Sequence, residues 1–249
     1  MTGTATYVTR LGDGVALELE QAPGVFRPTY TSELLMKAMR TRVRGAARIL
    51  DLGCGSGVVG IALARLELVA PPLYASDVSA EAVALARRNA ERHGVAIDAR
   101  AGSLFEPWPG MRFDYVVDDV SGIAEEVARL SPWFRESIPC AAGPDGSELT
   151  CAVLRGAAAH LAADGALLIP VISLSAGARI LDTARAHFER VEKVNEQRWP
   201  LPEELAAHME RLRALRSDGH VAFEERFGMV LCTTAVYLCR GVKETSREG

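Results

Sequence analysis

The sequence lacks several features that would place it outside ordinary globular enzymes. Its 249 residues contain no apolar run long enough to span a membrane. The first residues lack a charged start followed by an apolar stretch, so we expect no secretion signal. Five cysteines, an odd number with no C-x-x-C pair, predict reduced thiols in a cytoplasmic protein. The net charge of −4 argues against a broad nucleic-acid-binding face, although it leaves a local one possible.

The most informative stretch of the sequence is RILDLGCGSGVVG, at residues 48–60. A short apolar run at 49–52 predicts a buried strand, and an apolar helical pattern begins at residue 58. Between them lie Gly53, Gly55 and Gly57. Glycines let a ligand lie against bare backbone, and the start of a helix offers free N–H groups. The stretch therefore predicts a nucleotide-type binding site.

Two ligands fit such a turn. Gly55, Gly57 and Gly60 also match the spaced glycines of dinucleotide sites, which keeps a nicotinamide-dependent oxidoreductase as an alternative. Asp51, at the end of the strand, would repel a pyrophosphate. The same carboxylate would attract the ammonium group of S-adenosylmethionine, directly or through water. We therefore expect S-adenosylmethionine as the cofactor.

A second acidic residue ends the next predicted strand, at 72–77. Asp77 follows Gly57 by twenty residues, and a carboxylate in this position can accept both ribose hydroxyls. Its alternative role is to help cap the helix that Ser79 begins. The other expected cofactor contacts are Val78 and the pair Ser103–Leu104, which follow the second and third strands.

The remaining pattern predicts a doubly wound α/β fold with a seven-stranded, mostly parallel, Rossmann-like sheet. Residues 1–30 would form an N-terminal β-hairpin, turning at Asp13-Gly14, and a lead-in to a domain at 31–249. A helix capped by Thr31 or Ser32 would follow. Residues 166–173, after a break at Asp164-Gly165, would form the fifth strand. An insertion at 199–228 would carry one helix from Pro202 to about Arg216, as a solvated helix or an acceptor-side wall.

Several stretches between about residues 15 and 175 resemble the HemK-type methyltransferases, which belong to class I. PGVFRPTYTSELL is similar to the segment ahead of that family's first motif, and DLGCGSGVVGIALA to the motif itself. Later segments of the family are matched by GSLFEPW, FDYVVDDV and GPDGSE. The resemblance implies binding of S-adenosylmethionine by residues that include Asp51, Gly53, Gly55, Asp77 and Ser103.

The departures from the family concern the methyl acceptor. The family's Asn-Pro-Pro-Tyr, which holds a planar amide in release-factor methylation, is replaced by Asp119-Val120-Ser121-Gly122. The family's helical N-terminal domain has no counterpart in the sequence. The resemblance therefore implies cofactor binding without implying glutamine methylation.

These observations predict an S-adenosylmethionine-dependent methyltransferase acting on nitrogen or oxygen of a small molecule. Asp119 is the expected catalytic residue, orienting the acceptor or taking its proton. The expected acceptor wall is Tyr30, Ser121 and His208. Alternatives are a protein or RNA acceptor, contacted by the arginines at 211, 213 and 216, and a use of the cofactor other than methylation.

Overall fold

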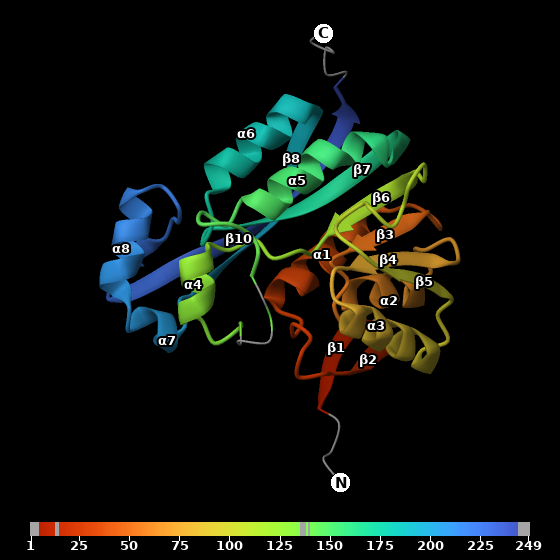
Figure 1. The fold of residues 1–249 in the computed structure, drawn as a ribbon, viewed down its shortest axis with the longest axis horizontal. Coiled ribbons are helices and arrows are strands. Elements are labelled where there is room, and N and C mark those ends of the chain that lie inside the picture. The colour runs from red at the N-terminus through yellow and green to blue at the C-terminus, as the bar shows by residue number, and fades with distance from the viewer. Residues whose placement is uncertain (1–4, 13–14, 135–137, 139, 244–249) are drawn as a thin grey trace.

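The computed structural model describes residues 5–12, 15–134, 138 and 140–243. A mixed sheet runs through its centre in the order β5-β4-β3-β6-β7-β10-β8, and the short strand β9 pairs with β10 (Figure 1). The strands are β3 (Ile49–Leu52), β4 (Leu73–Asp77), β5 (Ile97–Ala101), β6 (Phe113–Asp118), β7 (Leu161–Ile172), β8 (Phe188–Pro200), β9 (Glu224–Arg226) and β10 (Met229–Val242).

The pairing confirms the predicted fold class. Strands β5, β4, β3, β6 and β7 are parallel to one another, whereas β10 is antiparallel to β7 and β8. The strand order reverses between β3 and β6. In open parallel sheets, ligands bind outside the carboxyl ends of the strands at such a reversal.

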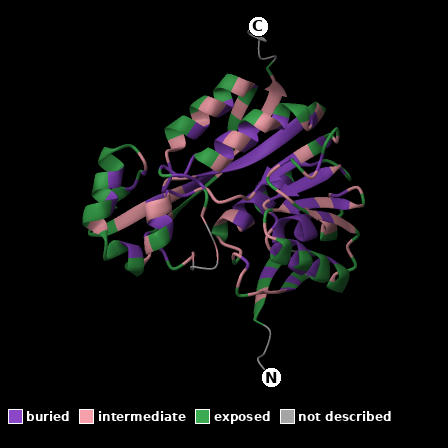
Figure 2. Cartoon of the chain, viewed as in Figure 1, coloured by how far each residue is buried: buried purple, intermediate pink, exposed green. Residues whose placement is uncertain are grey.

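Helices cover both faces of the sheet, and apolar residues are buried between the layers (Figure 2). One face packs against α1 (Tyr30–Arg42), α2 (Val58–Arg65) and α3 (Ala80–Arg92), and the other against α5 (Glu148–Gly156) and α6 (Gly177–His187). A 3-10 turn at Ala157–Ala159 follows α5. As expected, Ser79 caps α3, since its hydroxyl accepts from the Ala82 amide at 3.2 Å. The expected cap of α1 is wrong: Thr29, rather than Thr31 or Ser32, holds that position.

The N-terminal strands β1 (Thr6–Gly12) and β2 (Val15–Glu20) form an antiparallel pair, as predicted. The turn expected at Asp13-Gly14 lies outside the described residues. The hairpin is fastened to α3, because the Glu20 amide donates to the Asn89 side chain at 2.8 Å. Leu17 and Leu19 of β2 are fully buried against the core.

An arm extends from the sheet at the far end of β8 and β10 (Figure 1). It carries α4 (Glu125–Leu130), α7 (Glu203–Ala206) and α8 (Met209–Ser217), which pack together through their own apolar cluster. Two expectations are wrong here. The single helix expected at 202–216 is divided at His208. Residues 122–139 were also expected to be helical with a loop around Ser131-Pro132-Trp133, but the described part of that range holds a single short helix, α4. None of the helices in the described ranges is both long and apolar enough to cross a membrane.

The start of the fifth strand also differs from expectation. Strand β7 begins at Leu161 and continues through Asp164-Gly165, where a break was expected. Its pairing with β6 shifts register between Phe113 and Tyr115, so the extra residues are accommodated as an irregularity within the strand.

Candidate functional site

A cavity of about 470 Å³ lies at the carboxyl ends of the central strands. We divide its lining into two parts. The glycine side comprises Gly53, Gly55, Ser56, Asp77, Val78, Ser103 and Leu104, and the aromatic side comprises Phe26, Asp119, Ser121, Trp133, Phe134 and Trp199.

The glycine side begins at the turn between β3 and α2. Gly53 and Gly55 have φ values of +78° and +51°, which side chains rarely adopt. A Cβ on Gly53 would come within 3.0 Å of the backbone nitrogen of Val120, whereas one on Gly55 would meet only the Phe26 carbonyl, at 3.8 Å. The absence of side chains thus keeps the turn close to the Val120 loop and leaves bare backbone facing the cavity.

Asp77 stands at the end of β4 beside this turn. Its carboxylate accepts from the Gly55 amide at 3.0 Å and from the Ser79 amide at 2.9 Å. Each carboxylate oxygen has a second lone-pair direction, so Asp77 can fix the turn and still accept hydroxyls from the cavity. Both roles considered for Asp77 are therefore compatible with its position.

Two expected cofactor residues do not line the cavity. Asp51 is 1% exposed, and its Oδ2 accepts from the Gly60 amide at 2.9 Å, while its Oδ1 has no hydrogen-bond partner among the described residues. Burial raises the pKa of Asp51 to about 7, against the lowering effect of the Gly60 hydrogen bond. Gly57 is the N-cap of α2, and a Cβ there would meet Ile61 at 2.9 Å. These two residues stabilise the turn without contributing to the cavity lining.

Asp119 lies where the two sides meet, directly after β6. The Ser32 hydroxyl donates to its Oδ2 at 2.7 Å, and its backbone amide donates to the Leu52 carbonyl at 2.9 Å. Burial raises the pKa of Asp119 well above its usual range; the Ser32 hydrogen bond lowers it, and the carboxyl groups of Asp51 and Asp118 raise it further. This carboxyl group therefore binds a proton more readily than an exposed aspartate does.

Asp118, the preceding residue, is fully buried. Its Oδ1 accepts from the Val120 amide at 3.2 Å, and its Oδ2 has no hydrogen-bond partner in the part of the chain that the structure describes. Burial raises the pKa of Asp118 to about 7. The strand end thus holds two adjacent carboxyl groups whose ionisation is costly, of which Asp119 faces the cavity.

The aromatic side contains residues that the sequence did not single out. The rings of Phe26 and Phe134 lie 4.8 Å apart, and those of Trp133 and Trp199 lie 5.8 Å apart, edge to face. The Trp199 indole N–H donates to the Thr234 hydroxyl at 3.0 Å. These rings come from the lead-in to α1, the segment after α4 and the end of β8. No local sequence signal connects these segments.

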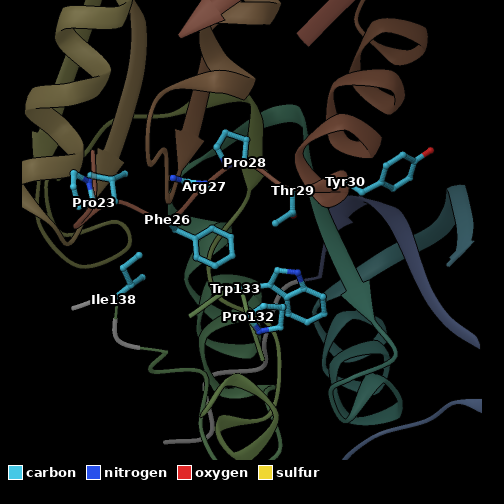
Figure 3. Close-up of a pocket in the computed structure, with 10 residues that line it drawn as sticks. Pro23, Phe26, Arg27, Pro28, Thr29, Tyr30, Pro132, Trp133 and Ile138 are labelled. Carbon is cyan, nitrogen blue, oxygen red and sulfur yellow. The ribbon is translucent and has the colours of Figure 1, made fainter. Parts of the chain in front are cut away.

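Only part of the expected acceptor wall lines the cavity. Ser121 lines the cavity. Tyr30 also contributes to the lining, but its hydroxyl bonds to Gln197, and Figure 3 shows its ring pointing away from Phe26 and Trp133. His208 is exposed at the start of α8 and does not line the cavity. Its expected contact with the acceptor is therefore not supported.

A second hollow of about 330 Å³ adjoins the aromatic side (Figure 3). It shares Phe26 and Trp133 with the main cavity and adds Pro23, Arg27 and Pro132 to its own lining. The aromatic side therefore continues outward beyond the main cavity.

The arginines of α8 are engaged within the arm. Arg211 lies 3.6 Å from Glu126, and Arg213 and Arg216 lie 2.6 Å and 3.3 Å from Glu225. Partnered arginines offer less charge to phosphates than free ones would. The idea that these arginines contact RNA is correspondingly weakened.

The glycine side fits S-adenosylmethionine on three observations. Gly55 presents backbone to open space, and the Asp77 carboxylate keeps free lone-pair directions at the end of β4. Ser56 is also among the lining residues, and its buried hydroxyl has no hydrogen-bond partner within the described part of the chain, which is a polar group that a ligand could satisfy.

The comparisons with known proteins point the same way. The family described as Methyltransferase small domain matches residues 16–119. The release factor glutamine methyltransferase of Geobacter sulfurreducens is 34% identical over 167 residues, which are 66% of this chain and 58% of that protein. The ribosomal protein uL3 glutamine methyltransferase of Bordetella pertussis is 31% identical over 148 residues, which are 56% of this chain and 49% of that protein. The chain thus spans less than two thirds of the length of these curated relatives.

Among solved structures, the T. thermophilus 16S rRNA N2 G1207 methyltransferase, in complex with AdoMet and guanosine, superposes with a TM-score of 0.61. The superposition covers 95% of this chain and 50% of that one, at 16% sequence identity. At this identity the likeness establishes the fold.

Proposed function

We propose that the chain, which resembles HemK-like S-adenosylmethionine-dependent methyltransferases in sequence and has the fold of class I methyltransferases, methylates a side chain of a protein. The curated relatives are named for release factors and a ribosomal protein, which are protein acceptors. The small-molecule acceptor expected from the sequence has no support among them, and we replace it.

The observation that carries this proposal is the second hollow. It extends the aromatic side by about 330 Å³ past the main cavity, through the shared rings of Phe26 and Trp133. A compact metabolite would need only the main cavity. A protein segment can place one side chain in the cavity and its flanking residues in the hollow.

The glycine side would hold the cofactor through the backbone of Gly53 and Gly55 and the carboxylate of Asp77, with Ser56 and Ser103 nearby. S-adenosylmethionine supplies a methyl group on a positively charged sulfur. Most of the catalysis then comes from alignment, because an acceptor atom held in line with the methyl carbon reacts without further ordering.

On the aromatic side, Asp119 would receive a hydrogen bond from the acceptor group. Ser32 fixes the Asp119 carboxyl through Oδ2, which leaves Oδ1 for the acceptor. The aromatic rings would exclude water from the reacting atoms.

The test is methyl transfer from isotope-labelled S-adenosylmethionine into a bacterial protein extract whose own enzymes have been inactivated by heat. We expect label in protein that survives nuclease treatment and is released by protease. Label in the RNA or small-molecule fraction would contradict the proposal. Calorimetry with S-adenosylhomocysteine checks the glycine side separately, and absence of binding at tens of micromolar would count against cofactor binding itself.

A further inference from the structure

We infer that the methylated atom is the nitrogen of a primary aliphatic amine, and that Asp119 takes the proton which this nitrogen must lose. The inference rests on the protein-acceptor function proposed above and specifies the chemistry of the acceptor. It follows from the charges, the rings and the position of Asp119 in the main cavity.

The charge of the cavity lining has one sign. Among the described residues, the charged side chains that line the main cavity are Asp77 and Asp119. Arg27 lines the second hollow only. Both side chains are partly buried, and a partly buried carboxylate is stabilised more by a cation, which balances its charge, than by a neutral group. The lining therefore favours an acceptor that arrives as a cation.

The aromatic side adds an independent reason. The same cavity as Asp119 is lined by the rings of Phe26, Trp133, Phe134 and Trp199, and ring faces attract ammonium groups. A lysine side chain also carries an apolar stem that packs on such rings while its charged end reaches a polar partner. A cavity that offers both aromatic rings and a carboxylate matches an alkylammonium, because the rings suit its apolar stem and the carboxylate suits its charged end.

A carboxamide would find a poorer match. An amide is neutral, so it would leave the Asp119 charge unbalanced, or would meet a protonated acid. In the family pattern an asparagine stands at this position, and an asparagine side chain complements a neutral amide. The replacement of that residue by an acid changes the preferred partner from a neutral group to a cationic one.

The proton step also requires an acid-base group. An ammonium has no lone pair for attack, so its proton passes to the Asp119 carboxylate and leaves a neutral amine. The new N–C bond then forms as the C–S bond of the sulfonium breaks, and the electron pair of that bond stays on sulfur. The product is a methylammonium together with a neutral thioether, and the proton on Asp119 is released to water.

The surroundings of Asp119 suit this role. Ser32 contacts it from α1, and the carboxyls of Asp51 on β3 and Asp118 on β6 act on it. The charge of Asp119 contributes in turn to raising the pKa of Tyr7 on β1. The neighbouring acids and burial bring the pKa of Asp119 toward that of an amine, which makes proton transfer to it easier.

The first test identifies the labelled residue. Protein methylated in the extract assay is hydrolysed in strong acid, which splits amides but leaves N-alkyl bonds of amines intact. We expect the label in methyllysine, which chromatography separates from the other products. Label released as volatile methylamine would indicate a carboxamide, and label in methylarginine would indicate a guanidinium. Either result would overturn the inference while leaving the protein-acceptor function standing, whereas absence of labelled protein would defeat both.

The second test uses the pH profile of kcat/KM on the labelled protein substrate. The wild-type profile should be level between the pKa of Asp119 and that of the amine. With Asp119→Asn only the free amine reacts, so activity should rise about tenfold per pH unit toward the amine pKa of roughly 10.4. A variant profile parallel to the wild-type profile would show that Asp119 takes no proton.

A third measurement tests the rings. Phe134→Leu should raise the KM for the protein acceptor by roughly 3- to 30-fold, the range expected for a lost cation–π contact. The control is Phe227→Leu, which changes a ring that is 86% exposed and outside the cavity, and should leave KM unchanged. Equal effects of the two substitutions would contradict the assignment.

Discussion

The two sides of the cavity are made from different parts of the chain. On the glycine side, the cavity is faced by backbone and short side chains, held by local hydrogen bonds such as the one from the Gly55 amide to Asp77. On the aromatic side, it is faced by large rings from three distant segments, among them Phe26, Trp133 and Trp199. A backbone surface allows few substitutions, whereas a side-chain surface can change one residue at a time. The aromatic side is therefore where acceptor choice can diverge.

The largest effect on cofactor affinity is expected from adding a side chain to the glycine turn. Gly53→Ala places a Cβ 2.9 Å from the Val120 side chain and 3.0 Å from its backbone nitrogen, at a φ of +78°. Backbone strain at residue 53 and displacement of Val120 should together cost about 3 kcal/mol of binding free energy. This is roughly a hundredfold loss of affinity for S-adenosylhomocysteine, which calorimetry measures.

The matched control is Gly45→Ala. Gly45 has a similar φ of +74°, and a Cβ there meets nothing within 4 Å. This variant should lose about 1 kcal/mol of stability through backbone strain and bind the cofactor product normally. If Gly53→Ala also binds normally, the turn does not hold the cofactor and the division of the cavity is wrong.

The next effect concerns Asp118, at the boundary between the two sides. Its raised pKa of about 7 means that the folded protein binds its proton more tightly than the unfolded chain does. Its contribution to the free energy of unfolding is therefore fully present near pH 4 and is lost as the pH rises to about 7. Asp118→Asn cannot ionise, so it should be more stable than wild type at pH 8 by about 4 kcal/mol, and not at pH 4.

Urea unfolding at the two pH values measures this difference. Asp51 has a similarly raised pKa and remains in the variant, so the variant should keep part of the pH dependence. A gain in stability that is equal at pH 4 and pH 8 would mean that Asp118 is ionised in neither condition or in both.

A smaller effect is expected for Asp77→Asn. The amide keeps one oxygen for the Gly55 or Ser79 N–H but loses the charge that favours ribose hydroxyls, so affinity for S-adenosylhomocysteine should fall about tenfold. The KM for the protein acceptor should not change, because Asp77 belongs to the glycine side. Asp98→Asn, an acid on the neighbouring strand β5 that does not line the cavity, is the control. A lower melting temperature with unchanged affinity would mean that Asp77 only fixes the turn.

The sequence predicted the parts of the fold that depend on local patterns. The strand and glycine turn at 49–57 and the Ser79 cap follow from periodicity and short-range hydrogen bonds. The cap of α1 could not be chosen among three neighbouring hydroxyls, because Ser32 bonds instead to Asp119, a residue 87 positions away. The rings of the aromatic side were missed for the same reason, since Phe26 and Phe134 come together only in the folded chain.

The arm shows a related limit. The pattern at 202–216 is helical throughout, yet the helix divides at His208. Leu205 on α7 and Leu212 on α8 both turn into the apolar cluster of the arm, where they are fully buried. Packing of two short helices on β10 and α4 outweighs the preference for one continuous helix, a balance that local propensity does not contain.

The smallest effect is expected at His208, where the sequence suggested a contact with the acceptor. Its side chain is exposed and makes no capping hydrogen bond to α8, so His208→Ala should alter kcat/KM less than about twofold and stability by under about 0.5 kcal/mol. Leu205→Ala, three residues earlier, removes a buried side chain of the arm and should cost about 2–5 kcal/mol. A large activity loss in His208→Ala with normal stability would bring the arm itself into the acceptor site. A loss confined to Leu205→Ala would leave the arm as the support that holds Trp199 and Phe134 in place.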